Sequence, residues 1–230
     1  MNNSTVPVIT IDGPSGAGKG TVAQMLALDL GWNILDSGAL YRTLAFFMNE
    51  NDISLEQFDE NADEIKKMFK VSFDPGIPGE PVKVIFNKED ITSKIRTEEI
   101  AKITSTLATE PKIREFIKPC QREFMISPGL IADGRDMGTV IFADAQYKIF
   151  LTASIEERAK RRQTQLKRHG LEVNMRSLLQ ELVERDKKDT EREHPPLVPA
   201  DNSVIIDTSN LNPEGAVSYT HLTLPTTQVV

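Results

Sequence analysis

Short runs of apolar residues, with few polar positions inside them, recur along the chain and are separated by stretches with helical spacing. The runs cover residues 6–11, 33–35, 130–132, 147–151 and 204–206. Four of them lead directly into an aspartate, namely Asp12, Asp36, Asp133 and Asp207. Continuous apolar runs between helices are typical of strands buried on both faces of a parallel sheet. The pattern therefore predicts an α/β core.

Helical periodicity is clearest in three places. Between the first two runs, apolar residues recur at helical spacing as far as Leu30, and Gly31 stands where a left-handed C-terminal cap would lie. Further helices are predicted from about Thr97 and from Pro111. Pro119 has no backbone N–H to donate, so we expect it to bend the third helix without dividing it.

Residues 71–91 depart from this alternation of runs and helices. Prolines and glycines crowd residues 75–81, and a β-like run lies on either side of them. The second run alternates apolar and polar residues from Val82 to Phe86, which predicts a β-hairpin on the rim of the core. We expect a core of residues 1–62 and 100–215 and an insertion of residues 63–99.

Composition and charge narrow the function classes. The 230 residues are 39% hydrophobic and 27% charged, as in folded globular proteins. The net charge of -7 argues against broad binding to nucleic acid, because phosphate backbones attract basic surfaces. No apolar run reaches the ~18 residues of a membrane span and no signal peptide is recognisable, so we expect a cytoplasmic protein that does not bind membranes.

Residues 13–21 form a glycine-rich segment between the first run and the first helix. Its members are Gly13, Pro14, Ser15, Gly16, Ala17, Gly18, Lys19, Gly20 and Thr21. Glycines let backbone N–H groups approach phosphate oxygens, and Lys19 adds a positive charge. Gly20 stands where the usual pattern has Ser or Thr after the lysine, which moves the hydroxyl to Thr21. We interpret the segment as a nucleoside triphosphate site. The alternative is a helix-capping turn with an exposed lysine.

Four motifs together resemble the bacterial cytidylate kinase family. They are ITIDGPSGAGKGT (residues 9–21), LDSGALYR (35–42), IADGRDMGTVIF (131–142) and ERDKKDTER (184–192), and the resemblance extends from about residue 6 to residue 209. It implies a P-loop kinase core with a five-stranded parallel sheet flanked by helices, a small β-containing monophosphate-binding insertion and a short helical lid at residues 155–172. It also implies ATP-dependent phosphorylation of CMP and dCMP with Mg²⁺, with small-molecule nucleotides as partners, and we expect a monomer.

The resemblance implies roles for particular residues. Catalytic roles fall to Lys19, Arg135, Arg185 and Arg192, and triphosphate contacts to Arg158 and Arg162. The acceptor nucleotide would be bound by Ser37, Arg42, Ser105, Arg114, Arg135, Asp136, Arg185 and Asp189, and Thr21 would contact magnesium that is held mainly by ATP and water. Several arginines suit this reaction, because two anionic substrates repel each other and guanidinium groups hold phosphate oxygens in a fixed geometry.

Base choice follows from hydrogen-bond chemistry. Cytosine presents an N4 amino donor beside the N3 and O2 acceptors, so a matching site places a carboxylate at N4 and donors at the other two atoms. By resemblance, Asp136, Arg114 and Ser105 match the residues that do this in the family. Uracil has an acceptor in place of the amino donor and would set an oxygen against the carboxylate.

Simpler interpretations of these residues stay open without the resemblance. Asp36 would serve as a helix cap. Arg185, Asp189 and Arg192 are spaced i, i+4, i+7, which also describes a solvated charged helix face. The basic run at residues 158–168 fits a solvated face, an RNA-binding patch or a lid.

Two other functions also stay open. Residues 87–90, Asn-Lys-Glu-Asp, match the NKxD motif with which GTP-binding switch proteins recognise guanine, although no DxxG segment occurs between the phosphate loop and this motif. A kinase for UMP, AMP or dTMP would share the phosphate loop. A panel of monophosphate acceptors separates the three functions.

The end of the chain departs from the family pattern, which continues after the fifth strand with an amphipathic helix. Residues 216–230 contain no Asp, Glu, Lys or Arg and show no periodicity. We interpret the sequence from Gly215 onward as foreign, as in read-through into adapter or vector, and expect residues 216–230 to be disordered or irregular. Their deletion should leave activity and melting temperature almost unchanged.

Overall fold

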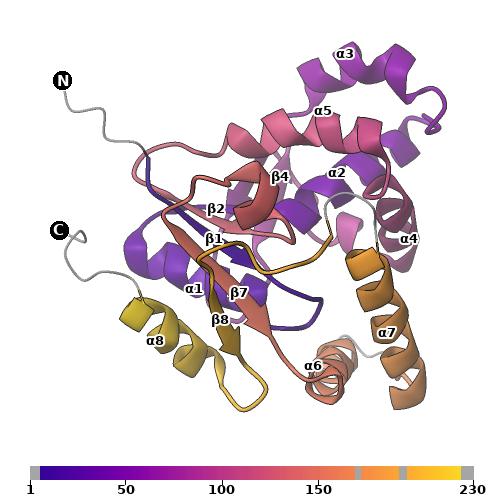
Figure 1. Ribbon diagram of the computed structural model, residues 1–230. Helices are drawn as coiled ribbons and strands as arrows, with labels where there is room; N and C mark the ends of the chain where they lie inside the picture. Colours follow the sequence, from indigo (N-terminus) through magenta and orange to yellow (C-terminus); the bar gives the residue numbers. More distant parts are fainter. Residues whose placement is uncertain (1–5, 169–171, 192–195, 224–230) are drawn as a thin grey trace, which may run out of the picture.

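The computed structural model describes residues 6–168, 172–191 and 196–223, in which strands and helices alternate (Figure 1). The strands are β1 (Val8–Asp12), β2 (Asn33–Asp36), β3 (Val71–Asp74), β4 (Lys83–Phe86), β5 (Glu89–Asp90), β6 (Leu130–Asp133), β7 (Tyr147–Thr152) and β8 (Val204–Asp207). The helices are α1 (Lys19–Leu30), α2 (Ser37–Glu50), α3 (Phe58–Met68), α4 (Glu98–Leu107), α5 (Pro111–Arg122), α6 (Ile155–Arg168), α7 (Met175–Glu191) and α8 (Pro213–Thr223), with a 3₁₀ turn η1 (Lys94–Arg96) and a π-helical turn η2 (Met137–Ile141). Within these ranges, no helix combines the length and the apolar character that crossing a membrane requires.

Five strands form one parallel sheet in the order β2-β6-β1-β7-β8, which confirms the predicted α/β core. The register sets Asp36 beside Asp133, and Asp133 beside Ile11 of β1. The aspartates that end β1, β2 and β6 therefore lie together at the carboxyl edge of the sheet. In open α/β sheets, ligands bind beyond this edge.

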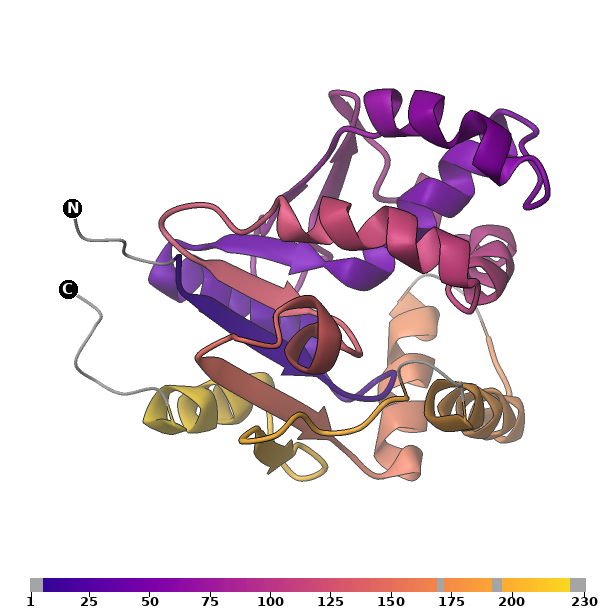
Figure 2. The ribbon, with the colours of Figure 1, turned by 45° about the horizontal axis from the view of Figure 1, so that its top comes forward.

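Alternate residues of the strands pack on opposite faces of the sheet. Ile11 of β1 packs with Leu26 of α1, in a cluster that also contains residues of α8. Val8 of the same strand packs on the other face, in a cluster with Leu44 of α2 and Ile117 of α5. Successive side chains of a strand point to opposite faces of the sheet. A sheet buried on both faces therefore needs apolar residues at odd-numbered and even-numbered positions alike. The sheet therefore lies between two helical layers (Figure 2), which is why its strands contain few polar residues.

Helices α6 and α7 pack against each other beyond the carboxyl edge (Figure 1). α6 contains the basic run and covers most of the predicted lid, of which residues 169–171 lie outside the described residues. Asn174 begins α7, since its side chain accepts a hydrogen bond from the Arg176 N–H (2.8 Å).

The insertion carries a three-stranded antiparallel sheet in the order β3-β4-β5, one strand more than predicted. The extra strand, β5, has only two residues and both are exposed, so no periodicity marks it. Asn87 and Lys88 form the turn between β4 and β5, and both have positive φ (49° and 72°), as two-residue hairpin turns require. Residues 87–90 therefore belong to a hairpin outside the core sheet. This position does not fit the NKxD motif of a GTP-binding switch protein.

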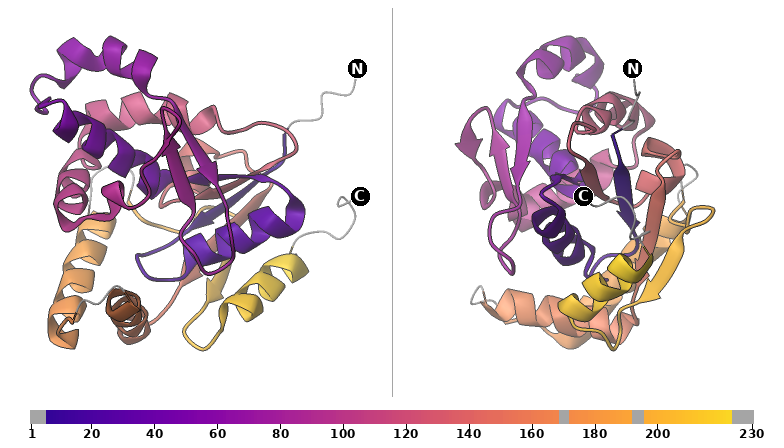
Figure 3. Two further views of the ribbon diagram at one scale, coloured as in Figure 1. Left: turned by 180° about the vertical axis from the view of Figure 1, so that it is seen from behind. Right: turned by 90° about the vertical axis from the view of Figure 1, so that its left-hand side faces the viewer.

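The β3–β4 hairpin runs across to α1 and is fixed there (Figure 3). Gln24 of α1 is 2% exposed. Its side-chain amide donates to the carbonyl oxygens of three loop residues, Pro75 (2.5 Å), Glu80 (2.9 Å) and Ile77 (3.2 Å). This contact ties the proline- and glycine-rich loop to α1 of the core.

Most predicted helix ends agree with the structure. Gly31 ends α1 in the left-handed region (φ 63°), and Thr97 caps α4 through its side chain. α5 continues through Pro119 as one helix. α3 was not predicted, because only Phe58 and Ile65 of its residues are buried and the apolar stripe is correspondingly sparse.

The prediction that the chain ends in irregular structure is wrong for α8. The Asn212 side chain accepts a hydrogen bond from the Gly215 N–H (2.8 Å), and a proline follows Asn212 at the first helical position. This helix start escaped the sequence analysis, which looked for charge and periodicity. Ala216 and Val217 are 3% and 5% exposed and pack with α1, so burial of small residues holds the helix. Residues 224–230 lie outside the described residues.

Burial of α8 makes stability sensitive to its inner face. Val217→Ser removes a buried apolar side chain, which costs about 1.5–3 kcal/mol and lowers the melting temperature by about 3–10 °C. Tyr219→Ser is the matched control, because Tyr219 lies on the same helix and is 53% exposed. Thermal unfolding followed by circular dichroism measures both variants. Equal melting temperatures for the Val217 variant and the wild type would show that α8 contributes nothing to the fold.

Candidate active site

The phosphate loop, residues 13–21, follows β1 at the carboxyl edge and leads into α1. Gly13 has a φ of +146°, and a Cβ there would lie 2.0 Å from the carbonyl oxygen of Leu151, so only glycine fits. Gly18 caps α1 with a φ of 92°. The first N–H groups of a helix have no partner within it and supply positive potential. The predicted sequence of strand, loop and helix is confirmed.

Lys19 is the first residue of α1 and is 7% exposed. Its Nζ donates to the carbonyl oxygen of Pro14 (3.0 Å) within the same loop. Burial, followed by the charge of Arg135, lowers the pKa of Lys19 to about 8. The alternative of a capping turn with an exposed lysine is therefore wrong. A poorly compensated buried cation favours an anionic ligand.

Asp133, at the end of β6, is a neighbour to which the sequence analysis gave no role. A Cβ on Gly20 would lie 3.4 Å from its Oδ2, so this carboxylate lies directly beside the phosphate loop. Burial raises the pKa of Asp133 to about 7 against the opposing charge of Lys19. Burial also raises the pKa of Asp12 to about 6, although this carboxylate accepts two N–H groups of η2 (2.9 and 2.8 Å). The signal in the sequence was the aspartate that follows four of the five apolar runs.

Stability is expected to depend on the protonation of Asp133. Folding raises its pKa from the ordinary 3.8 to about 7, so the protonated carboxyl stabilises the fold below about pH 4 and this contribution is lost as the pH rises through 7. The Asp133→Asn side chain has no charge at any pH. Urea unfolding at pH 5 and pH 8 should show the variant gaining stability relative to the wild type as the pH rises. A stability difference that does not change with pH would contradict the raised pKa.

Three arginines from different elements converge on this edge. Burial lowers the pKa of Arg42 on α2. Arg185 on α7 is exposed as a residue, yet desolvation and then the charge of Arg135 lower its pKa to about 10. The Arg135 Nε donates to Oδ2 of Asp189 (2.5 Å), and this carboxylate raises the pKa of Arg135 against the effect of burial. The positive charges of Arg135 and Arg185 both help to lower the pKa of Lys19. The structure therefore gathers these predicted residues around one position.

Two of the three predicted base-recognition residues also meet. Arg114 of α5 forms an ion pair with Asp136, and their side chains are 15% and 7% exposed. Arg114 also donates to the carbonyl oxygen of Ala108 (3.3 Å). Ser105 on α4 is exposed and makes no hydrogen bond to either residue within the part of the chain that the structure describes.

The start of α2 lies at the same edge. Asp36 caps the helix by accepting a hydrogen bond from the Ala39 N–H (2.9 Å), as the simpler interpretation of Asp36 expects. Ser37 follows it and is buried. Its Oγ accepts a hydrogen bond from Nε2 of Gln121 on α5 (2.8 Å). Sequence analysis gave no role to Gln121, which lies 84 residues away in the chain.

Arg158 of α6 contacts the phosphate loop, although through the protein backbone. It is 5% exposed, and its guanidinium donates to both carboxylate oxygens of Asp186 on α7 (3.0 and 2.5 Å). The same group donates to the carbonyl oxygen of Ser15 in the loop (3.1 Å). Arg158 therefore braces the loop against α6 and α7 in this structure.

Arg161 and Arg162 of the same helix contact different parts of the protein. The Arg162 side chain is 43% exposed and lies 4.0 Å from the Glu98 carboxylate at the start of α4. Arg161, which the sequence analysis left out, donates to the hydroxyl (3.0 Å) and the carbonyl oxygen (2.5 Å) of Thr208 after β8. Thr208 in turn donates to the carbonyl oxygen of Ala17 (2.9 Å). Arg161 is thus a further support of the phosphate loop.

Two predicted residues remain to be placed. Arg192 lies outside the described residues. Thr21 is half-buried in the first turn of α1, on the same turn as Lys19. Within the described ranges, no group of three or more His, Cys, Asp or Glu side chains could hold a metal ion by itself.

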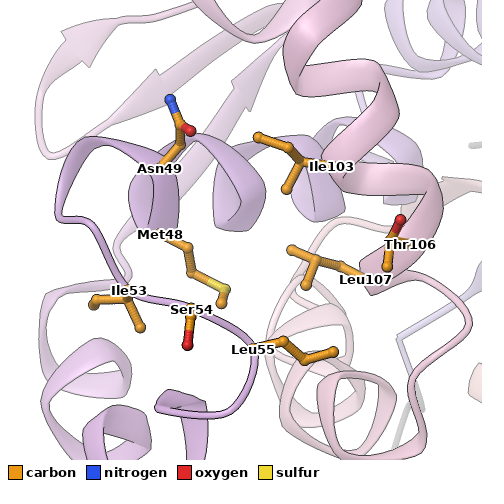
Figure 4. A pocket seen from close by; sticks show the side chains of 8 residues that line it. All are labelled: Met48, Asn49, Ile53, Ser54, Leu55, Ile103, Thr106 and Leu107. Atoms are coloured by element: carbon orange, nitrogen blue, oxygen red, sulfur yellow. The ribbon is translucent and has the colours of Figure 1, made fainter.

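A pocket of about 290 Å³ lies apart from these residues, between α2, the loop after it and α4 (Figure 4). Apolar side chains dominate its lining, which consists of Met48, Asn49, Ile53, Ser54, Leu55, Ile103, Thr106 and Leu107. None of the predicted site residues lines it. The predicted nucleotide-binding residues therefore lie away from this pocket.

Comparison with known proteins gives a consistent result. Residues 9–220 match the family model described as cytidylate kinase. The chain is 50% identical over 208 residues to the cytidylate kinase of Shewanella frigidimarina, and the aligned residues make up 90% of each protein. It is 50% identical over 204 residues to that of Shewanella oneidensis (89% of this chain, 88% of that protein) and 51% identical over 203 residues to that of Shewanella putrefaciens (88% of each).

Proposed function

The chain belongs to the cytidylate kinase family and transfers a phosphoryl group from ATP to CMP, and we propose that its carboxyl edge divides into a donor side and an acceptor side. One observation supports the division above all. The charges of Arg135, after β6, and Arg185, on α7, both act on Lys19 of the phosphate loop, and the charge of Arg42, on α2, acts on Arg185. Arg135 pairs with Asp189, but repulsion among these cations helps to lower the pKa values of Lys19 and Arg185, and two anionic nucleotides placed between them would relieve this repulsion.

On the donor side, the phosphate loop binds the ATP phosphates. Backbone N–H groups at the start of α1 and the Lys19 ammonium face the phosphate oxygens, and Arg158 and Arg161 hold the loop in shape through Ser15 and Thr208. Thr21 and Asp133 would supply oxygen ligands of the kind that Mg²⁺ prefers, and the Asp133 carboxylate lies near Gly20, the residue before Thr21. When bound, magnesium neutralises charge on the phosphates, which are its principal ligands together with water.

On the acceptor side, Arg42 and Arg135 hold the phosphate of CMP, with Ser37 at the start of α2. Arg185 and Asp189 on α7 hold the sugar and the phosphate. Arg114, Asp136 and Ser105 recognise the cytosine base. Because dCMP presents the same base and phosphate to these residues, we expect it to be a substrate as well. Arg162 contacts the ATP phosphates, and by resemblance Arg192 acts on the transferring phosphate.

The reaction needs no general base near neutrality, because the attacking atom is already an anionic phosphate oxygen. The acceptor oxygen attacks the γ-phosphorus of ATP in line with the bond to the β-phosphate oxygen, which leaves as ADP. Lys19 and the arginines stabilise the charge on the transferring group and on the leaving oxygen. Positioning and electrostatics thus supply the catalysis.

A panel of acceptors tests this function. Initial rates with ATP and Mg²⁺ are measured for CMP, dCMP, UMP, AMP and dTMP by coupling ADP release to NADH oxidation. We expect CMP and dCMP to have the highest kcat/KM values, since cytosine, unlike uracil and thymine, offers an amino donor to Asp136 beside acceptors for Arg114. Equal or better turnover of UMP would refute the base assignment, and hydrolysis of ATP without any acceptor would refute the division into two sides.

A further inference from the structure

Gln121 is a buried polar side chain that the scheme above does not use. It lies near the end of α5 and is 1% exposed. Its neighbours on the inner face of α5, Ile113 and Ile117, belong to the apolar cluster between α5 and the sheet. Its Nε2 donates to Ser37 Oγ (2.8 Å), whereas its Oε1 is buried and has no hydrogen-bond partner within the described residues.

An amide in this position is unfavourable for packing alone. A buried oxygen without a partner costs free energy that Leu or Met, of similar volume, would not incur. Such a group in a folded protein calls for a functional reason. Within the described residues, the amide nitrogen donates its hydrogen bond to Ser37. We therefore look to Ser37 for the function that a buried glutamine serves here.

The direction of this hydrogen bond fixes what the Ser37 hydroxyl can do. Because Gln121 donates, it occupies a lone pair of Ser37 Oγ and leaves the hydroxyl hydrogen available for another acceptor. If the amide were reversed, Ser37 would donate to Gln121 instead. A phosphate offers only acceptor oxygens, so the observed orientation is the one that suits an acceptor phosphate at the start of α2.

We propose that Gln121 is a positioning residue, which holds the Ser37 hydroxyl as a hydrogen-bond donor to the phosphate of the acceptor nucleotide. The inference rests on the proposed role of Ser37. The proposal adds a residue of α5 to the acceptor side. It also explains why a glutamine is buried where only its amide nitrogen finds a hydrogen-bond partner among the described residues.

Steady-state kinetics of the full-length chain tests the proposal. Gln121→Leu should raise the KM for CMP about three- to tenfold and change the KM for ATP less than twofold. Gln121→Glu should raise the KM for CMP at least as much, because a carboxylate accepts the Ser37 hydroxyl hydrogen and turns it away from the phosphate. Thr43→Val is the matched control: it removes a buried hydrogen bond on α2, from Thr43 Oγ1 to the carbonyl oxygen of Ala39, without contacting Ser37. Gln121→Met replaces Gln121→Leu should the leucine variant not fold.

The double variant distinguishes positioning from a general structural role. Ser37→Ala should raise the KM for CMP, and adding Gln121→Leu should raise it no further, because Gln121 acts only through Ser37. A further increase in the double variant, or equal changes in the KM values of ATP and CMP, would overturn the proposal. If Ser37→Ala alone leaves the KM for CMP unchanged, the role of Ser37 fails and the inference fails with it. If Ser37→Ala raises the KM and Gln121→Leu does not, the inference alone fails.

Discussion

Replacing Lys19 by Met lowers kcat by about two to three orders of magnitude while the protein stays folded. In the structure, the Lys19 ammonium is buried and bound to the carbonyl oxygen of Pro14. A phosphate oxygen is a stronger partner for a cation than a carbonyl, so ATP binding should draw Nζ to the phosphates. There the charge stabilises the transferring group, and losses of this kind cost about 10²–10³ in kcat. Met keeps the length and the apolar stem of the side chain without its charge.

Single-turnover and steady-state rates with ATP and CMP measure the Lys19→Met effect, and circular dichroism confirms folding. Lys94→Met is the matched control, because Lys94 is an exposed lysine whose ion pair with Glu89 lies in the insertion. This control should retain wild-type turnover. Wild-type turnover in a folded Lys19→Met variant would refute the direct role of the lysine in phosphoryl transfer.

Replacing Asp136 by Ala lowers kcat/KM for CMP by about 10- to 100-fold and leaves the KM for ATP within twofold of the wild type. The Asp136 side chain is 7% exposed and pairs with Arg114. Without it, the N4 amino group of bound cytosine loses its acceptor and the Arg114 guanidinium loses its carboxylate. Unsatisfied buried groups of this kind cost about 1–3 kcal/mol or more. The loss therefore falls on the acceptor nucleotide.

Asp136→Asn refines this test. An amide can accept from the cytosine amino group through its oxygen or donate to the uracil oxygen through its nitrogen, so the ratio of kcat/KM for CMP over UMP should fall. Asp59→Ala is the matched control, since it removes an ion pair with Lys112 in which Asp59 is 67% exposed. A rise in the KM for ATP with an unchanged KM for CMP would show that Asp136 belongs to the donor side.

The phosphate loop and the ends of the core strands were predictable from the sequence. Residue 13 must be glycine because the β7 backbone approaches it closely, and the glycine is visible in the sequence. The aspartates at the ends of β1, β2 and β6 converge because parallel strands bring their carboxyl ends to one edge. Spacing and residue type carry such features, since each depends on neighbours in the chain or on the period of a strand.

The orientation of individual side chains was not predictable from the sequence in this way. Three arginines of α6 have the same chemistry and different partners. Arg158 pairs with Asp186, Arg161 donates to Thr208, and Arg162 lies 4.0 Å from the Glu98 carboxylate. Their partners come from α7, from the end of β8 and from α4. No periodicity in residues 158–168 distinguishes these three destinations, because each depends on which element packs beside that face of α6.

By itself, the sequence determined the α/β core, the phosphate loop and the motifs of the family, because each depends on residue type and on spacing along the chain. Only the tertiary structure decided that Gln121 meets Ser37 across 84 residues and that α8 is held by Ala216 and Val217 on α1. These contacts join segments that share no local pattern. They form because packing of the apolar faces brings the segments together, and the polar groups then take the partners that this packing leaves within reach.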